Sequence, residues 1–264
     1  MGGYIPSTRE ERAQMLAAIG LEKPEELFAS VPEALRVKRL NLETGLSEMA
    51  LSRFMRGVAA KNRVYRSIFR GAGAYNHYIP AVVGAVTSKE TFVTAYTPYQ
   101  AEMSQGVLQS IFEYQTMICE LTGMDVSNAS VYDGATAAAE AVNMLVDAKK
   151  RVALVSETVH PMTLETIRTY AFGAGMEVRV IPAKGGRTDM DALAGMLNKD
   201  VACVLLQSPN YFGLIEDGEK AAELAHANRS KVILSVNPIA CALYRTPGEL
   251  GADVAVGEGQ PLGL

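Results

Sequence analysis

The alternation of short apolar segments with helix-length segments, from residue 128 onward, constrains the fold more than any other feature of the sequence. Segments connected in this way form right-handed crossover units and a mainly parallel sheet. Their nearly continuous apolar character fits a sheet that is covered on both faces. The sequence therefore predicts an α/β fold. The expected strands are Val152–Val155, Glu177–Ile181, Val201–Leu206, Val232–Val236 and Asp253–Val256.

Polar residues follow these predicted strands at their carboxyl ends. In a parallel sheet, ligands bind in the crevice at this edge. We therefore expect the polar residues to lie along one rim, where a binding site would form. They are Tyr132 and Asp133 and the segments 156–160, 207–210, 235–237 and 257–260.

The segment before the first of these strands resembles a phosphate-binding turn. A short strand, Ala129–Val131, is expected to lead into Asp133, Gly134, Ala135 and Thr136. Gly134 would permit a tight turn, and the small side chains after it would let backbone N–H groups approach an anion at the start of the next helix. A strand that packs against a capped helix needs much the same residues. A phosphate seat and a purely structural turn both stay open.

A polar, aromatic loop precedes a long helix predicted from Gln105 to Leu121, which Gly123 should end. Its hydroxyl, amide and carboxylate groups could orient a small zwitterion, or its tyrosines could be packed at an interface. Both interpretations stay open. The loop groups are Tyr96, Tyr99, Gln100, Glu102 and Ser104.

The N-terminal part of the chain has helical periodicity. Ser7 or Thr8 is expected to cap a helix from Glu10 to Ile19, and a second capped run follows near Lys23–Leu27. We predict an N-terminal helical extension and arm over residues 1–93, and an incomplete large domain over residues 94–264.

Charge and cysteine usage exclude several classes of protein. A net charge of −4 and a pI near 5.5 argue against binding to nucleic acid or to an anionic membrane surface. No apolar stretch is long enough to span a membrane and no signal peptide is evident, so a cytoplasmic location is expected. Cys119, Cys203 and Cys241 are widely spaced among apolar neighbours. We expect small core residues there, with neither a disulfide nor a metal site.

Three segments carry a resemblance to a known family: Tyr96–Gly106, Asn128–Glu140 and Arg245–Asp253. They resemble the glycine cleavage system P-protein, glycine decarboxylase, and in particular its N-terminal half, which in many bacteria is a separate subunit 1, or alpha subunit. The likeness runs from Tyr4 to the last residue. It implies the fold of pyridoxal-phosphate (PLP) enzymes of the aspartate-aminotransferase type, fold type I. It also implies an oxidoreductase of glycine catabolism, in which glycine loses CO2 and its aminomethyl group passes to lipoate on the H-protein.

The resemblance implies that the cofactor pocket of this chain is vestigial. The position of the Schiff-base lysine falls on Gln260, and the position of the acid that protonates the pyridine nitrogen falls on Ser235 or Asn237. Neither an amide nor a hydroxyl can replace these groups. His160 falls where the catalytic half of the family places a histidine near the cofactor ring. PLP is therefore expected on a lysine-bearing partner, subunit 2, and the turn at Asp133 becomes a remnant of a phosphate site.

In the family, loops of the non-catalytic half help to line an active site between the two halves, and the Tyr96–Gly106 loop is the candidate for that role. Family members also continue beyond Val256 with another strand and a C-terminal domain, so the chain is expected to be a fragment that is inactive alone. Two alternatives stay open. The chain could be an autonomous PLP-dependent lyase or transferase whose lysine lies elsewhere, or a non-catalytic interaction subunit.

Overall fold

The computed structural model describes residues 6–37, 40–71, 76–93, 96–100 and 105–263. The chain divides into two compact units, Met1–Phe69 and Arg70–Leu264. The domain boundary predicted at residues 93 and 94 stays a prediction. Glu102 and Ser104 lie outside the described residues.

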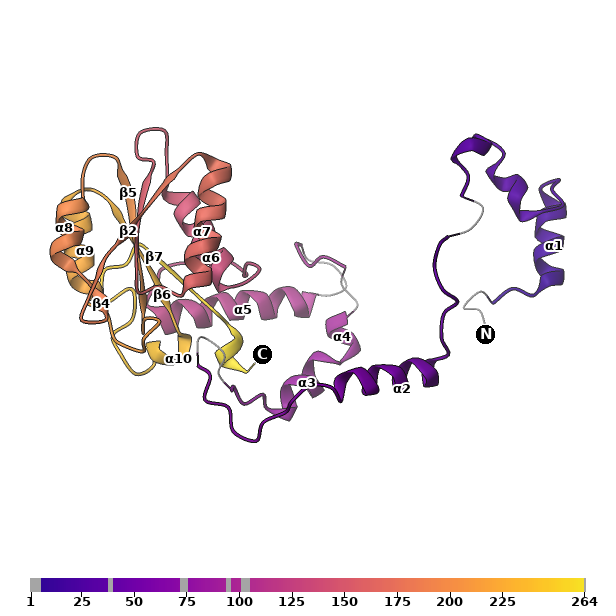
Figure 1. Ribbon diagram of the computed structural model, residues 1–264, viewed down its shortest axis with the longest axis horizontal. Helices are drawn as coiled ribbons and strands as arrows, with labels where there is room; N and C mark the ends of the chain where they lie inside the picture. Colours follow the sequence, from indigo (N-terminus) through magenta and orange to yellow (C-terminus); the bar gives the residue numbers. More distant parts are fainter. Residues whose placement is uncertain (1–5, 38–39, 72–75, 94–95, 101–104, 264) are drawn as a thin grey trace. The chain divides into compact units, whose positions relative to one another are not determined.

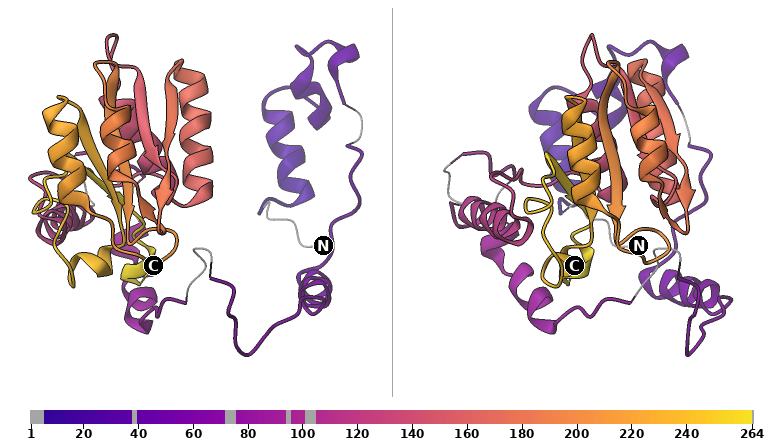
Figure 2. Two further views of the ribbon diagram at one scale, coloured as in Figure 1. Left: turned by 60° about the vertical axis from the view of Figure 1, so that its left-hand side comes forward. Right: turned by 90° about the vertical axis from the view of Figure 1, so that its left-hand side faces the viewer.

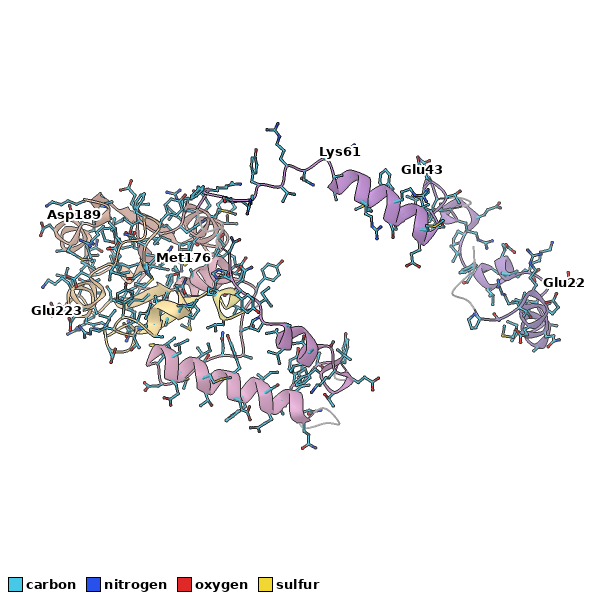
Figure 3. All side chains as sticks on the ribbon, turned by 90° about the horizontal axis from the view of Figure 1, so that it is seen from below. Glu22, Glu43, Lys61, Met176, Asp189 and Glu223 are labelled. Carbon is cyan, nitrogen blue, oxygen red and sulfur yellow. The ribbon has the colours of Figure 1, made fainter. Side chains whose placement is uncertain are left out.

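The first unit consists of helices that are stabilised locally. Thr8 caps α1 in a capping box: its hydroxyl accepts from the Glu11 N–H at 3.1 Å, and the Glu11 carboxylate accepts from the Thr8 N–H at 2.6 Å. No described residue of these helices is buried, and in Figure 3 the side chains along α2, towards Lys61, project outward from the ribbon. Capping, and not a core, therefore accounts for α1 and α2 within this unit, whereas η1 and η2 have no side-chain cap. Its elements are α1 (Arg9–Ala18), η1 (Pro24–Phe28), η2 (Glu33–Leu35) and α2 (Glu48–Ala59).

The second unit contains the predicted α/β fold. Its helices are α3 (Ala81–Thr87), α4 (Glu90–Val93), α5 (Gln105–Thr122), α6 (Gly134–Leu145), α7 (Pro161–Ala174), α8 (Met190–Met196), α9 (Gly218–Ala227), α10 (Pro238–Cys241) and η3 (Gln260–Leu262). Its strands are β1 (Val152–Ser156), β2 (Glu177–Ile181), β3 (Ala183–Lys184), β4 (Arg187–Thr188), β5 (Val201–Ser208), β6 (Lys231–Val236) and β7 (Val254–Gly257).

Five of these strands form a parallel sheet in the order β2-β1-β5-β6-β7, and β3 and β4 form a separate antiparallel pair. All five predicted strands are confirmed, as is their parallel arrangement. The chain moves from β1 to β2 on one side and later returns to β5 on the other side. The strand order therefore reverses between β1 and β5, which is where ligands bind in sheets of this kind.

Helices cover both faces of the sheet, as Figures 1 and 2 show. On one face α6 and α7 pack over Val155, Leu205 and Ile233, and on the other α8 and α9 pack over Leu206 and Leu234. Every residue of β1 is buried, which explains why this strand lacks a polar alternation, whereas the edge strand β2 alternates polar and apolar residues.

The cysteine prediction is confirmed for two residues. Cys203 and Cys241 are buried, whereas Cys119 is half-buried. Burial raises the pKa of the Cys203 thiol to about 12, so this thiol stays protonated and behaves as a small apolar side chain.

The expected strand at Ala129–Val131 is wrong. These residues form a loop between α5 and α6, in which Ser130 has a φ of 157°, outside the usual range of strands. A three-residue segment with one β-branched side chain has little apolar surface to bury, and no described strand pairs with it.

The C-terminus of α5 is fixed by two glycines. The helix ends at Thr122, one residue beyond the predicted Leu121, and Gly123 takes the left-handed φ of 69° that favours glycine. The Gly248 N–H donates to the Thr122 carbonyl at 3.0 Å, and a Cβ on Gly248 would lie 2.0 Å from the Gly123 carbonyl oxygen. The segment 245–253 therefore packs directly against the end of α5.

Candidate functional site

The carboxyl ends of β5 and β6 present polar side chains towards the face covered by α6. Gln207 and Ser235 are partners in the β5–β6 register. They lie two residues beyond Leu205 and Ile233, which belong to the core under α6. Because side chains alternate along a strand, Gln207 and Ser235 share that face. The predicted rim thus lies beside α6.

Gln207 ties the loop after β1 to the end of β5. Its Oε1 accepts from the His160 backbone N–H at 2.8 Å, and its Nε2 donates to the Pro209 carbonyl at 3.3 Å. A second bond, from the Tyr211 N–H to the Thr158 carbonyl at 2.8 Å, joins the same two loops. Hydrogen bonds therefore join the two loops at the point where the strand order reverses.

His160 lies at this rim as the N-cap of α7. Its Nδ1 accepts from the Met162 N–H at 3.2 Å, and its ring meets the Tyr211 ring edge to face, with the centroids 5.3 Å apart. An Nδ1 that accepts a hydrogen bond leaves the proton of the neutral ring on Nε2. A role for His160 in a reaction stays a prediction.

A buried carboxylate, which sequence reasoning missed, organises the loops behind the rim. Glu216 accepts from the Thr158 hydroxyl and the Asn210 amide, both at 2.7 Å. It also accepts from the Thr188 N–H at 3.0 Å, and the Ser156 hydroxyl bridges Thr158 and Thr188. All five residues are buried. The network joins β1, the β3–β4 pair and the loop after β5, so it holds the rim in shape.

The N-terminus of α6, the candidate phosphate site, is capped by two carboxylates of the chain itself. Asp133 Oδ1 accepts from the Thr136 N–H at 2.7 Å and from the Thr136 hydroxyl. The bond from the Thr136 hydroxyl, and to a smaller extent the bond from the Thr136 N–H, hold the pKa of Asp133 below its usual value. Glu258 Oε1 accepts from the Gly134 N–H at 2.8 Å.

The expected reason for a glycine at position 134 is wrong. Gly134 is not among the glycines with a positive φ, and a Cβ there would meet Glu258 and Gly257 at an ordinary contact distance of 3.5 Å. The turn therefore does not require the conformational freedom of glycine. Ala135 and Thr136 complete the first turn of α6 and are half-buried.

The residues at the predicted lysine and acid positions do not fit PLP. Gln260 begins η3 just after β7, Ser235 is half-buried in β6, and Asn237 caps α10 by accepting from the Ile239 N–H at 2.9 Å. None of these three side chains supplies an amine for a Schiff base or a carboxylate for a pyridine nitrogen. The Gly134 N–H, the expected phosphate donor at this helix start, bonds to Glu258.

The aromatic loop is exposed where it is described. The Tyr96 and Tyr99 side chains are 98% and 86% exposed, and the Tyr99 N–H donates to the Thr97 carbonyl at 2.9 Å. Gln100 is also exposed. Tyrosine rings usually bury most of their apolar surface.

A small cavity of about 240 Å³ lies elsewhere, at the ends of β5 and β6 on the face covered by α9. Its lining is mainly apolar and includes Pro209, Leu234, Val236 and Cys241. The candidate residues His160, Ser235 and Gln260 do not line it, although Ser208, Pro209 and Val236 of the predicted rim segments do, together with Glu216. The rim, and not this cavity, is the candidate site. Along the described parts of the chain, no helix has the length and apolar character needed to cross a membrane.

The fold defines the class. A solved NifS-like protein superimposes with a TM-score of 0.59 at 15% identity, over 73% of this chain and 55% of that one, so the sheet has the architecture of fold type I. The model of the glycine cleavage system P-protein matches residues 2–264, and the chain belongs to this family.

Two curated relatives show the same relationship. The probable glycine dehydrogenase (decarboxylating) subunit 1 of Desulfitobacterium hafniense is 48% identical over 98% of this chain and 59% of its own length. The protein of the same description from Moorella thermoacetica is 51% identical over 98% of this chain and 59% of its own length. The chain thus spans about three fifths of these relatives.

A solved structure supports the fold at higher similarity. The crystal structure of glycine decarboxylase (P-protein) of the glycine cleavage system, in inhibitor-bound form, superimposes with a TM-score of 0.89 at 40% identity. The match covers all of this chain and 60% of that one.

Proposed function

We propose that this chain belongs to the subunit of glycine decarboxylase that does not carry PLP, and that it completes an active site on a lysine-bearing partner, subunit 2. The complex would convert glycine and lipoylated H-protein into CO2 and aminomethyl-lipoyl H-protein. The observation that carries the proposal is the amide of Gln260, which begins η3 just after β7. The family resemblance implies that this is the position of the Schiff-base lysine.

The rim residues support the proposal. Ser235 and Asn237 cannot hold a pyridine nitrogen protonated, and the start of α6 bonds to Glu258 and Asp133. The family is PLP-dependent, so we assign the cofactor to the partner. No chemical step is assigned to a cofactor on this chain. PLP bound there would supply the electron sink for decarboxylation.

The loop before α5 would be this chain's contribution to the shared site. Tyr96 and Tyr99 are almost fully exposed and Gln100 lies beside them, so their hydroxyl and amide groups can face a substrate held by another chain. Glu102 and Ser104, outside the described residues, are proposed for the same surface. The complex would act in the cytoplasm.

The exchange of labelled bicarbonate into glycine, with lipoylated H-protein present, tests the proposal. We expect exchange only when this chain, within its complete subunit, is mixed with subunit 2. Exchange by the first subunit alone would point to an autonomous enzyme. If subunit 2 catalyses full exchange without a partner, and the two subunits still assemble when mixed, this chain would be a non-catalytic interaction subunit.

Reduction with borohydride in the presence of PLP gives an independent readout. A chain without a Schiff-base lysine should keep its mass, whereas a stoichiometric adduct on one lysine would contradict the proposal.

A further inference from the structure

We infer that the Glu258 carboxylate is an internal substitute for a bound phosphate. It occupies the N-terminus of α6 and thereby keeps anions out. The inference rests on the proposed function only in identifying the excluded anion as the phosphate of PLP. The Glu258 side chain would thus exclude the phosphate, and this effect would add to the absence of a Schiff-base lysine.

The contact is long-range in sequence and directed at a helix terminus. Glu258 Oε1 accepts from the Gly134 N–H at 2.8 Å, across 124 positions of the sequence. α6 is 12 residues long, so its first turn carries the partial positive charge that attracts anions. A charged acceptor at this position forms a stronger bond than a neutral one.

The backbone before Glu258 is held closely in place. Gly257 pairs with Val236 in the β6–β7 register, and a Cβ on Gly257 would lie 2.3 Å from the Val236 carbonyl oxygen. This close approach anchors the residue that precedes Glu258. The carboxylate therefore starts from a fixed backbone position at the end of β7, which favours a persistent contact.

A phosphate at the same place would meet two like charges. Asp133 already accepts from the Thr136 N–H at 2.7 Å, and Glu258 holds the Gly134 N–H. A dianion would need to displace Glu258 and would still lie beside Asp133. The same bond fastens the loop that carries Gln260 to α6, so the substitute anion also stabilises the rim.

The test uses inorganic phosphate as the probe and three variants of the chain. Glu258→Ala removes the carboxylate from the N-terminus of α6, and Glu258→Gln replaces it with a neutral acceptor. As the control, Glu140→Ala removes a carboxylate from an exposed position of the same helix. Each protein is titrated with phosphate at constant ionic strength. The readouts are the melting temperature and the NMR signal of the Gly134 amide.

We expect phosphate to shift the Gly134 amide and to raise the melting temperature of Glu258→Ala. Wild type and Glu140→Ala should bind phosphate at this amide about tenfold more weakly or not at all, and Glu258→Gln should lie between. If Glu258→Ala does not fold, the comparison of wild type with Glu258→Gln decides in the same way.

Two results would overturn the inference. One is a phosphate shift of Gly134 in wild type as large as in the Glu258 variants. The other is a Gly134 amide that ignores phosphate in every variant. Neither result affects the requirement for subunit 2 in bicarbonate exchange. Conversely, exchange by the first subunit alone would remove the proposed function and leave the role of Glu258 intact.

Discussion

The side-chain oxygen of Gln207 accepts the backbone N–H of His160 at 2.8 Å, across the point where the strand order of the sheet reverses. The bond joins the carboxyl end of β5 to the loop after β1. In most sheets of this kind a ligand would lie in this crevice. Here a glutamine of the chain bridges it.

Gln207→Ala should lower the free energy of unfolding by about 1 to 2 kcal/mol, because the partly buried His160 N–H loses its acceptor. Urea denaturation measures the change. Gln207→Glu keeps an acceptor and serves as the control. An alanine variant as stable as wild type would show that water replaces the glutamine at no cost.

Gly248→Ala should destabilise the second unit by about 3 kcal/mol, because its Cβ would collide with backbone and not with a flexible side chain. An added Cβ would lie 2.0 Å from the Gly123 carbonyl oxygen. Gly195→Ala is the matched control, since nothing lies within 4 Å of its Cβ. Thermal unfolding of both variants checks the prediction, which equal melting temperatures would refute.

Asp253 should make stability depend on pH in the acid range. Burial opposes its ionisation, but bonds from Lys231 at 2.7 Å and from His226 and the Val232 N–H at 2.8 Å outweigh burial. They hold the pKa of the folded state below the ordinary value of 3.8. A lowered pKa stabilises the fold above the unfolded-state value, and this stabilisation is lost as the pH falls through the folded-state value.

Asp253→Asn should therefore be less stable than wild type at neutral pH, and the difference should shrink as the pH falls below 3.8. Denaturation curves at several pH values measure this difference. A difference that stays constant down to the acid limit would mean that ionisation of Asp253 contributes nothing.

Tyr99→Phe, in the complex with subunit 2, should reduce kcat/KM by about 10 to 100-fold if its hydroxyl orients substrate, or roughly 1.4 to 2.8 kcal/mol of transition-state stabilisation. Assembly should stay intact. If Tyr99 only packs at an interface, Phe should leave the kinetics unchanged and Tyr99→Ala should weaken association. Steady-state kinetics and sedimentation of both variants separate the two roles.

The sequence was sufficient to predict the strands of the parallel sheet because β1 and most of β5 are buried and therefore nearly continuous apolar runs, and because the β-branched residues of β2, β6 and β7 recur between helix-length segments. The segment Ala129–Val131 has no such run, and its local composition suggested a strand that tertiary pairing does not support. The prediction for Gly134 is wrong because a glycine at a helix start suggests a tight turn, whereas Gly134 does not have a positive φ.

The contacts that shape the rim could not be predicted from local patterns. Glu258 and Gly134 are 124 positions apart, and Glu216 reaches Thr158 over 58 positions. No periodicity or spacing links such residues. Glu216 stands next to Asp217, the N-cap of α9, and its local sequence does not distinguish it from an exposed carboxylate at a helix start.

The bond between Gln207 and position 160 uses the main chain of residue 160 and not its imidazole. Any amino acid except proline supplies that donor. Relatives could therefore exchange the histidine for another side chain and alter the chemistry of the rim while the two loops stay fastened. At position 160, the side chain can therefore change without a change in the hydrogen bond that joins the two loops.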